Sequence, residues 1–175
     1  MTKPVVYFNE YNIRMGEFSY LPLVSGLLRA YAETFPEIKE NFNFEPFIYE
    51  MDVPSKILEQ YTKPPDIAAF SSVMWNEQLN YTMAKKVKEL WPNCIIIFGG
   101  SNVPMPPQHS IEEWMKEHPF VDIAVRAEGE EAFADILKRF INKESLRDLP
   151  GVAYREGHDF DSISIEFCNK ERPFK

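Results

Sequence analysis

The chain has 175 residues, of which 45% are hydrophobic, and its 19 Lys and Arg against 27 Asp and Glu give a net charge of −8. This length predicts one domain, and the acidic balance argues against nucleic acid or an anionic membrane surface as the main partner. Two cysteines do not indicate a disulfide scaffold, and no apolar run approaches the ~18 residues that span a membrane. Because the first residues show no signal peptide, we expect a reduced, cytoplasmic location.

Strand and helix patterns alternate along the chain. We expect strands over residues 5–8, 44–49, 67–71, 94–98 and 121–125. We expect helices over residues 22–35, 54–61, 76–90 and 111–116, and from residue 130 onward. Residues 9–20 are interpreted as a polar loop, Pro46 indicates an edge position for the second strand, and Asn76 is expected to cap the third helix.

Five strand–helix repeats predict an α/β fold, a doubly wound, flavodoxin- or Rossmann-like parallel sheet of five strands with helices on both faces. The expected strand order is 2-1-3-4-5, with the switch point between strands one and three. Residues 152–155 and 163–167, joined by a turn at 156–158, predict a C-terminal β-hairpin that extends the sheet edge or begins a link. We therefore expect a domain at 1–145 and an extension at 146–175, in a larger parent protein.

Ligands of open parallel sheets bind outside the carboxyl ends of the strands, where three loops of this chain carry unusual residues. The hydroxyls of Ser71 and Ser72 suit hydrogen bonds to a ligand, although capping of the following helix is an alternative. Gly99 and Gly100 end the fourth strand, where backbone can approach a flat or bulky ligand, or simply make a tight turn. Acidic residues such as Glu128 suit a helix N-terminus and discourage a phosphate there.

Other chemistry is sparse in this sequence. There is no Gly-x-Gly-x-x-Gly, no phosphate-binding Gly-x-x-x-x-Gly-Lys-Ser/Thr and no Gly-x-Ser-x-Gly nucleophile turn. His109, His118 and His158 have no metal-ligand spacing and are interpreted as surface histidines. Trp75 lies at the ligand edge, where its ring is placed to stack on a flat ligand.

Together these segments resemble the cobalamin-binding domain at the N-terminus of cobalamin-dependent radical S-adenosylmethionine (SAM) enzymes, over most of residues 4–155. The clearest parts of the resemblance are residues 66–73, 96–101, 121–130 and 149–155. It implies a slot for the nucleotide tail of cobalamin, lined by the serines and passing over the glycines. The cofactor-binding residues expected are Asn12, Ile13, Ser71, Ser72, Val73, Trp75, Gly99, Gly100, Ser101, Glu128, Gly129 and Glu130. The family's Gly-Glu-Gly-Glu turn has Ala127 in place of its first glycine.

A second departure concerns the cobalt ligand. Cobalamin domains of the mutase and methionine-synthase kind carry Asp-x-His-x-x-Gly after strand one, and that histidine ligates cobalt. Here Ile13 stands at the histidine position, counting back from Gly16. The resemblance therefore implies base-off cobalamin without a histidine ligand, resting over the strand-one loop, and no metal ligand or catalytic residue from this chain.

The radical half of such enzymes requires Cys-x-x-x-Cys-x-x-Cys, which two distant cysteines cannot supply. The [4Fe-4S] cluster and SAM are expected only in a radical SAM barrel of the same parent chain, which the resemblance implies to be a methyltransferase. Two alternatives remain open at this point. One is a non-catalytic flavodoxin-like sensor or interaction domain that binds another cofactor or none. The other, a nucleotide-dependent enzyme, is disfavoured by the missing phosphate loops.

Overall fold

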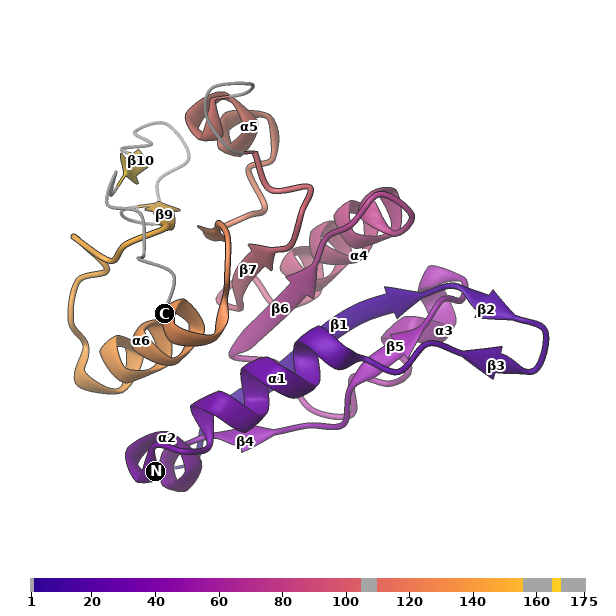
Figure 1. The fold of residues 1–175 in the computed structure, drawn as a ribbon, viewed down its shortest axis with the longest axis horizontal. Helices are drawn as coiled ribbons and strands as arrows, with labels where there is room; N and C mark the ends of the chain where they lie inside the picture. Colours follow the sequence, from indigo (N-terminus) through magenta and orange to yellow (C-terminus); the bar gives the residue numbers. More distant parts are fainter. Residues whose placement is uncertain (1, 105–109, 156–164, 168–175) are drawn as a thin grey trace.

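The computed structural model describes residues 2–104, 110–155 and 165–167, which form a twisted sheet covered by helices on both faces (Figure 1). The strands are β1 (Val5–Asn12), β4 (Asn43–Phe44), β5 (Ile48–Glu50), β6 (Ile67–Ser71), β7 (Ile95–Gly99), β8 (Ile123–Val125), β9 (Val152–Arg155) and β10 (Ile165–Phe167). Their order is β10-β9-β8-β7-β6-β1-β4, and β5 also pairs with β1. Two further strands, β2 (Arg14–Met15) and β3 (Phe18–Ser19), form a separate hairpin.

The predicted parallel order 2-1-3-4-5 is confirmed, with the predicted second strand at the edge. That strand is divided into β4 and β5, and both pairings with β1 are parallel. β9 pairs antiparallel with β8 and with β10, so the C-terminal strands extend the sheet at its other edge. The turn predicted at 156–158 and residues 163–164 lie outside the described residues, and the domain boundary at residue 145 stays a prediction.

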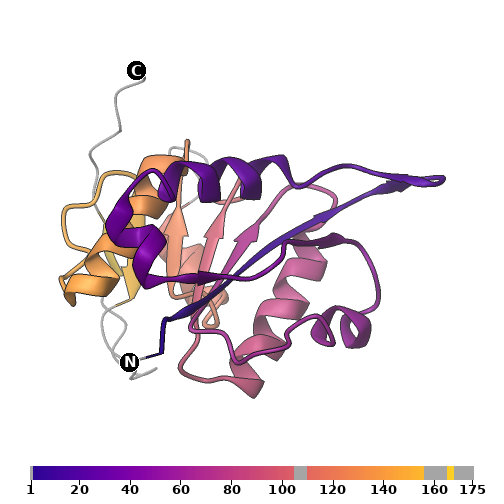
Figure 2. The ribbon, with the colours of Figure 1, turned by 90° about the horizontal axis from the view of Figure 1, so that it is seen from below.

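The helices divide between the two faces, as Figure 2 shows for α1 above the sheet and α4 below it. They are α1 (Leu23–Ala32), α2 (Pro36–Asn41), α3 (Pro54–Leu58), α4 (Glu77–Leu90), α5 (Ile111–Glu117) and α6 (Glu130–Asn142). Side chains of α1, α2 and α6 pack on one face, and those of α3, α4 and α5 on the other. The helix predicted over 22–35 ends at Ala32, because Phe35 is held extended by the proline that follows it and begins α2.

Successive residues of the central strands supply the two core layers. Ala69 of β6 and Ile97 of β7 face the layer of α1 and α6. Phe70 and Phe98 face α4, where their rings stack with centroids 5.2 Å apart. At these positions the alternation places aliphatic side chains towards α1 and α6 and aromatic ones towards α4.

The prediction of a polar loop over residues 9–20 is wrong for residues 9–12, which continue β1, and it omits the β2–β3 hairpin that follows. β1 continues to Asn12, and the β2–β3 hairpin then projects beyond the sheet (Figure 1). Asn9 lies wholly buried, where its Oδ1 accepts hydrogen bonds from the hydroxyls of Tyr11 (2.9 Å) and Tyr61 (2.8 Å). Its Nδ2 donates to the carbonyl of Ala69 at 3.2 Å. A polar strand residue is tolerated here because distant parts of the chain satisfy it.

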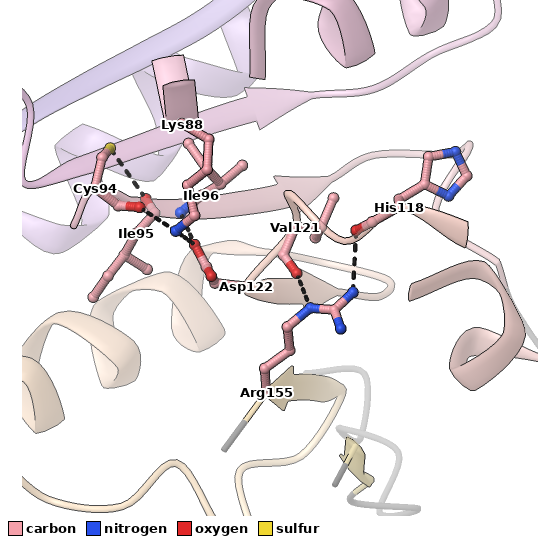
Figure 3. Close-up of polar contacts among 8 residues, drawn as sticks. All are labelled: Lys88, Cys94, Ile95, Ile96, His118, Val121, Asp122 and Arg155. Atoms are coloured by element: carbon pink, nitrogen blue, oxygen red, sulfur yellow. Dashed lines mark hydrogen bonds and ion pairs between the residues drawn. The ribbon is translucent and has the colours of Figure 1, made fainter. Parts of the chain in front are cut away.

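Hydrogen bonds close the amino edge of the sheet around Asp122, which precedes β8 (Figure 3). Its Oδ2 accepts from Lys88 Nζ and from the Ile96 amide, both at 2.7 Å. Beside it, Arg155 Nε donates to the Val121 carbonyl at 2.6 Å. Burial raises the pKa of the neighbouring Cys94 thiol to about 12, so this thiol stays protonated near neutral pH.

Candidate functional site

A cavity of about 410 Å³ lies at the carboxyl edge of the sheet, on the face covered by α1 and α6. Strands β1, β6, β7 and β8 contribute its apolar floor, which consists of Phe8, Ala69, Ile97 and Val125. Helices α1 and α6 contribute the walls, with Leu28 and Phe133 among the apolar side chains. The volume lies within the range typical of small-molecule pockets, roughly 300–1,000 Å³.

The absence of a side chain at Gly99 keeps this cavity open. A Cβ atom placed there meets nothing closer than the Val125 carbonyl oxygen, at 3.9 Å. Because Gly99 lines the cavity, a larger side chain at this position would occupy it. Ala69 on the neighbouring strand contributes only a methyl group to the same floor.

Gly100 is required for a different reason, which is the close approach of the loop after β6. Its φ is +104°, and a Cβ atom there would lie 2.3 Å from the Ser72 carbonyl oxygen. The Ser72 amide donates to the Gly99 carbonyl at 2.7 Å, and the Asn102 amide donates to the Ser72 carbonyl at 3.1 Å. The loops after β6 and β7 are therefore hydrogen-bonded to each other at the mouth of the cavity.

The turn between β8 and α6 forms another part of the cavity wall. Ala127 adopts the left-handed conformation with φ 60°, so this turn keeps a backbone geometry that favours glycine. Gly129 occupies the N-cap position of α6, where a Cβ atom would lie 3.1 Å from Leu28 Cδ2. The glycine at this position thus permits α6 to approach α1 closely.

The first turn of α1 borders the cavity and is capped by a carboxylate from β1. Glu10 is 7% exposed, and its Oε2 accepts from the Ser25 amide at 2.7 Å. Its Oε1 accepts from the Val24 amide at 3.4 Å. Ser25 and Val24 both line the cavity, so the N–H groups at this helix end are already hydrogen-bonded within the protein.

The structure brings most of the predicted site residues to one place. Those that line the cavity are Ser71, Gly99, Gly100, Ser101, Glu128, Gly129 and Glu130. The remainder lie outside its lining: Asn12 ends β1, Ile13 follows it, and the others lie on the loop after β6. Asn12 and Ser72 are buried, Val73 is half-buried, and Ile13 and Trp75 are 44% and 49% exposed. Neither serine caps α4, which has no side-chain cap, and the buried Ser72 Oγ has no hydrogen-bond partner.

Sequence reasoning missed the cavity residues that the helices supply. Leu28 and Phe133 lie within segments predicted to be helical but were not predicted to line a site, and Ser25 carried no signal. The missing information was that α1 and α6 cover the same face of the sheet. Right-handed crossovers in the strand order 2-1-3-4-5 place α1 on one face and α4 and α5 on the other. That rule does not fix the face of α6, because α6 leads to the antiparallel strand β9.

Within residues 2–104 and 110–155 no group of three His, Cys, Asp or Glu side chains is arranged to hold a metal ion. None of the helices in these ranges is both long and apolar enough to cross a membrane. His118 ends α5, with its Nδ1 2.7 Å from the Trp114 carbonyl, and takes no part in the cavity. His109 and His158 lie outside the described residues.

No family model matches the chain. It is 34% identical over 148 residues to the cobalamin-dependent radical SAM methyltransferase TokK of Streptomyces tokunonensis, a match that covers 84% of this chain and 21% of that protein. Identity and coverage are the same for the 2-(S-pantetheinyl)-carbapenam-3-carboxylate methyltransferase of Streptantibioticus cattleyicolor. The chain thus spans about a fifth of the length of these curated relatives.

Solved structures give the same fold. The cobalamin-dependent SAM radical enzyme OxsB, with aqua-cobalamin and SAM bound, matches 98% of this chain with a TM-score of 0.67 at 19% identity, over 23% of its own length. The radical SAM methyltransferase TsrM of Kitasatospora setae matches 89% of this chain with a TM-score of 0.64 at 13% identity, over 29% of its own length. The resemblance predicted from the sequence is thereby confirmed: the chain is homologous to one region of the cobalamin-dependent radical SAM methyltransferases.

Proposed function

We propose that this chain is a cobalamin-binding module, and that the nucleotide tail of cobalamin enters the cavity between α1, α6 and the carboxyl edge of the sheet. The observation that carries the proposal is the open space above Gly99, in a cavity with an apolar floor. Its homologues include enzymes whose names describe them as cobalamin-dependent, and OxsB was solved with aqua-cobalamin bound.

The residues present fit such a ligand. An aromatic base needs a flat, apolar slot, which Phe8, Ile97 and Phe133 supply. Ser71 and Ser101 add hydroxyl groups at the lining for hydrogen bonds to the polar part of the tail. These residues bind and orient the tail, and none of them is assigned a chemical step.

The corrin ring is proposed to lie against the loops after β1 and β6, outside the cavity. Ile13 and Trp75 are partly exposed on these two loops, and they present apolar surface for a macrocycle. No histidine stands in the loop after β1, so we propose base-off cobalamin without a histidine ligand. Bound cobalamin supplies methyl-group transfer, while this chain contributes its binding and orientation.

The reaction itself is assigned to other parts of a parent enzyme. The chain corresponds to about a fifth of its relatives' length and has no Cys-x-x-x-Cys-x-x-Cys motif. We infer that a radical SAM barrel of the same parent chain carries the [4Fe-4S] cluster and SAM. Methyl transfer is the activity proposed for that parent.

Titration with hydroxocobalamin tests the binding proposal. We expect a saturable change of the corrin absorbance bands, and an EPR spectrum of the reduced cob(II)alamin form without nitrogen superhyperfine splitting. Gly99→Val fills the cavity floor and is expected to weaken binding by roughly a hundredfold, about 2.7 kcal/mol.

Gly26→Ala is the matched control, because a Cβ atom at this α1 position meets nothing within 4 Å and Gly26 does not line the cavity. This variant should bind cobalamin as the unaltered chain does. Retained tight binding by Gly99→Val would overturn the tail slot. Failure of the unaltered chain to bind would instead favour a flavodoxin-like module with another cofactor or none.

A further inference from the structure

Asn76 lies at the N-cap position of α4, yet its side chain does not cap that helix. The expected cap would accept a hydrogen bond from the first helical turn. Instead the side chain turns back towards the ends of the strands, and Asn76 is only 1% exposed. An asparagine diverted from the usual cap and fully buried needs another explanation.

Both polar atoms of the Asn76 amide are used twice. Its Nδ2 donates to the carbonyl of Tyr11 at 3.1 Å, near the end of β1, and to the carbonyl of Ser71 at 3.0 Å, at the end of β6. Its Oδ1 accepts from the Val73 amide at 2.9 Å and from Asn80 Nδ2 at 3.0 Å. One side chain therefore joins β1, β6, the loop after β6 and α4.

These bonds lie at the switch point of the sheet, between its two central neighbours β1 and β6. The described pairing of β1 with β6 ends at Asn9 and Phe70, so the Tyr11 and Ser71 carbonyls lie beyond the ladder. Asn76 bridges the two strands where the backbone pairing has stopped. Its amide thus fixes how far apart they lie at the carboxyl edge.

The buried neighbour Asn80 shows that this arrangement is built at a cost. Asn80 Nδ2 donates to the Ser71 carbonyl and to Asn76 Oδ1, both at 3.0 Å. Its own Oδ1 is buried and has no hydrogen-bond partner. A buried acceptor without a partner in the protein is destabilising, so this side chain is held in place at an energetic cost.

The loop held by Asn76 is also joined to the cavity mouth. The Ser72 amide, inside this loop, donates to the carbonyl of Gly99 at the end of β7, and the Ser72 carbonyl accepts from the amide of Asn102 in the loop after β7. The Val73 amide donates a hydrogen bond to Asn76, and Trp75 directly precedes Asn76 in the sequence. A displacement of Asn76 would therefore move the surface of the β6 loop.

We propose that Asn76 is a positioning residue for cobalamin, which fixes the loop of residues 72–75 against the corrin ring. This proposal rests on the proposed function. The role requires two donors and two acceptor sites on one short, planar group, and among side chains of this length only the asparagine amide provides both. Aspartate retains the acceptors but would oppose a charged oxygen to the Tyr11 and Ser71 carbonyls.

Cobalamin and cobinamide, which lacks the nucleotide tail, are titrated into the unaltered chain and three variants. Asn76→Ala is expected to weaken the binding of both corrinoids by roughly tenfold or more, since it disturbs the surface that meets the ring. Gly99→Val should weaken cobalamin and leave cobinamide unaffected, because it fills only the tail slot.

Asn9→Ala is the matched control for lost stability. It also removes a wholly buried amide that bridges β1 and β6, but its partners are Tyr11, Tyr61 and Ala69 in the core. Urea denaturation at several temperatures identifies one temperature at which both alanine variants are folded. Asn9→Ala is then expected to bind both corrinoids within about threefold of the unaltered chain.

Equal effects of Asn76→Ala and Asn9→Ala on affinity would show a purely structural role and overturn the proposal. Should Asn76→Ala fail to fold, Asn76→Asp replaces it, with the same expected loss for both corrinoids. Cobinamide binding unchanged in a folded Asn76 variant also overturns the proposal, while the tail slot stands on the Gly99→Val result. Absence of any corrinoid binding by the unaltered chain overturns both.

Discussion

The two faces of the central strands differ sharply, although they are made of alternate residues of the same segments. Towards α4, Phe70 and Phe98 stack and fill the space beneath the helix. Towards α1 and α6, Ala69, Ile97 and Gly99 leave a cavity of about 410 Å³. One face stabilises the fold by close packing, and the other retains room for a ligand.

This difference shows how a parallel sheet with two covered faces still provides a binding site. A smaller side chain at one strand position opens space in one layer only, because the side chains of its sequence neighbours point to the opposite face. The close-packed layer supports the strand ends while the open layer receives the ligand. The three predictions that follow test this division of roles, and they run from the largest expected effect to the smallest.

The close-packed face contains buried ionisable groups, so the fold should become less stable at alkaline pH. Burial raises the pKa of Tyr11, of Tyr61 and of Cys94, the last to about 12. The unfolded chain releases these protons first, because its pKa values are near 8.5 for Cys and 10 for Tyr. The free energy of unfolding should therefore fall by about 4 kcal/mol between about pH 8 and about pH 10.5.

Urea denaturation at a series of pH values measures this dependence. In Cys94→Ala the fall should begin roughly 1.5 pH units later, because only the tyrosines, with an ordinary pKa of about 10, then lose protons in the unfolded chain. A free energy of unfolding that stays constant through this range would contradict the burial of these three groups.

Alanine substitutions at Gly99 and Gly100 should have different effects, because Gly99 keeps the cavity open whereas Gly100 permits the close approach of the loop after β6. Gly100→Ala places a Cβ atom 2.3 Å from the Ser72 carbonyl oxygen at a φ of +104°. It should lower the free energy of unfolding by about 3 kcal/mol. Gly99→Ala meets open space, so its free energy of unfolding should stay within about 1 kcal/mol of the original value. Chemical denaturation of both variants measures the difference, and equal effects would disprove it.

The smallest expected change in the free energy of unfolding comes from a substitution at Ala127, at the rim of the open face. Its φ of 60° is strained for alanine, whereas glycine adopts it freely. Ala127→Gly should raise the free energy of unfolding by about 0.5 kcal/mol, since relief of strain exceeds the entropy lost by a more flexible unfolded chain. Ala30→Gly, in the exposed face of α1, is the control and should lower it by about 1 kcal/mol. Thermal unfolding distinguishes these opposite signs, and a destabilised Ala127→Gly would rule out strain at this turn.

Much of this fold follows from local patterns. Apolar runs over residues 67–71 and 94–98 predicted the central strands, and a helical pattern from residue 130 onward predicted α6. The strand order followed from the alternation of strands and helices. These elements were predictable because each is determined by the residues within it.

The region after residue 8 was not predictable in this way. Asn9, Glu10 and Asn12 read as a loop, yet all three are buried in β1. Their partners lie at Tyr61, at the first turn of α1 and at the Tyr20 carbonyl, so only the folded chain makes their burial favourable. Asn76 misled for the same reason, because its side chain serves the strand ends rather than its own helix.

The carboxylate of Glu10 has a consequence for selectivity among anionic ligands. Helix N-termini at the carboxyl edge of parallel sheets attract phosphates, because free N–H groups and the helix dipole are directed at the ligand. In α1 the amides of Val24 and Ser25 already donate hydrogen bonds to the carboxylate of Glu10. A mononucleotide phosphate would have to displace this internal competitor and would also meet Glu128 and Glu130 at the cavity wall. The first turn of α1 is thus closed to a mononucleotide phosphate, and the cobalamin tail proposed for this cavity would have to place its phosphodiester away from that helix end.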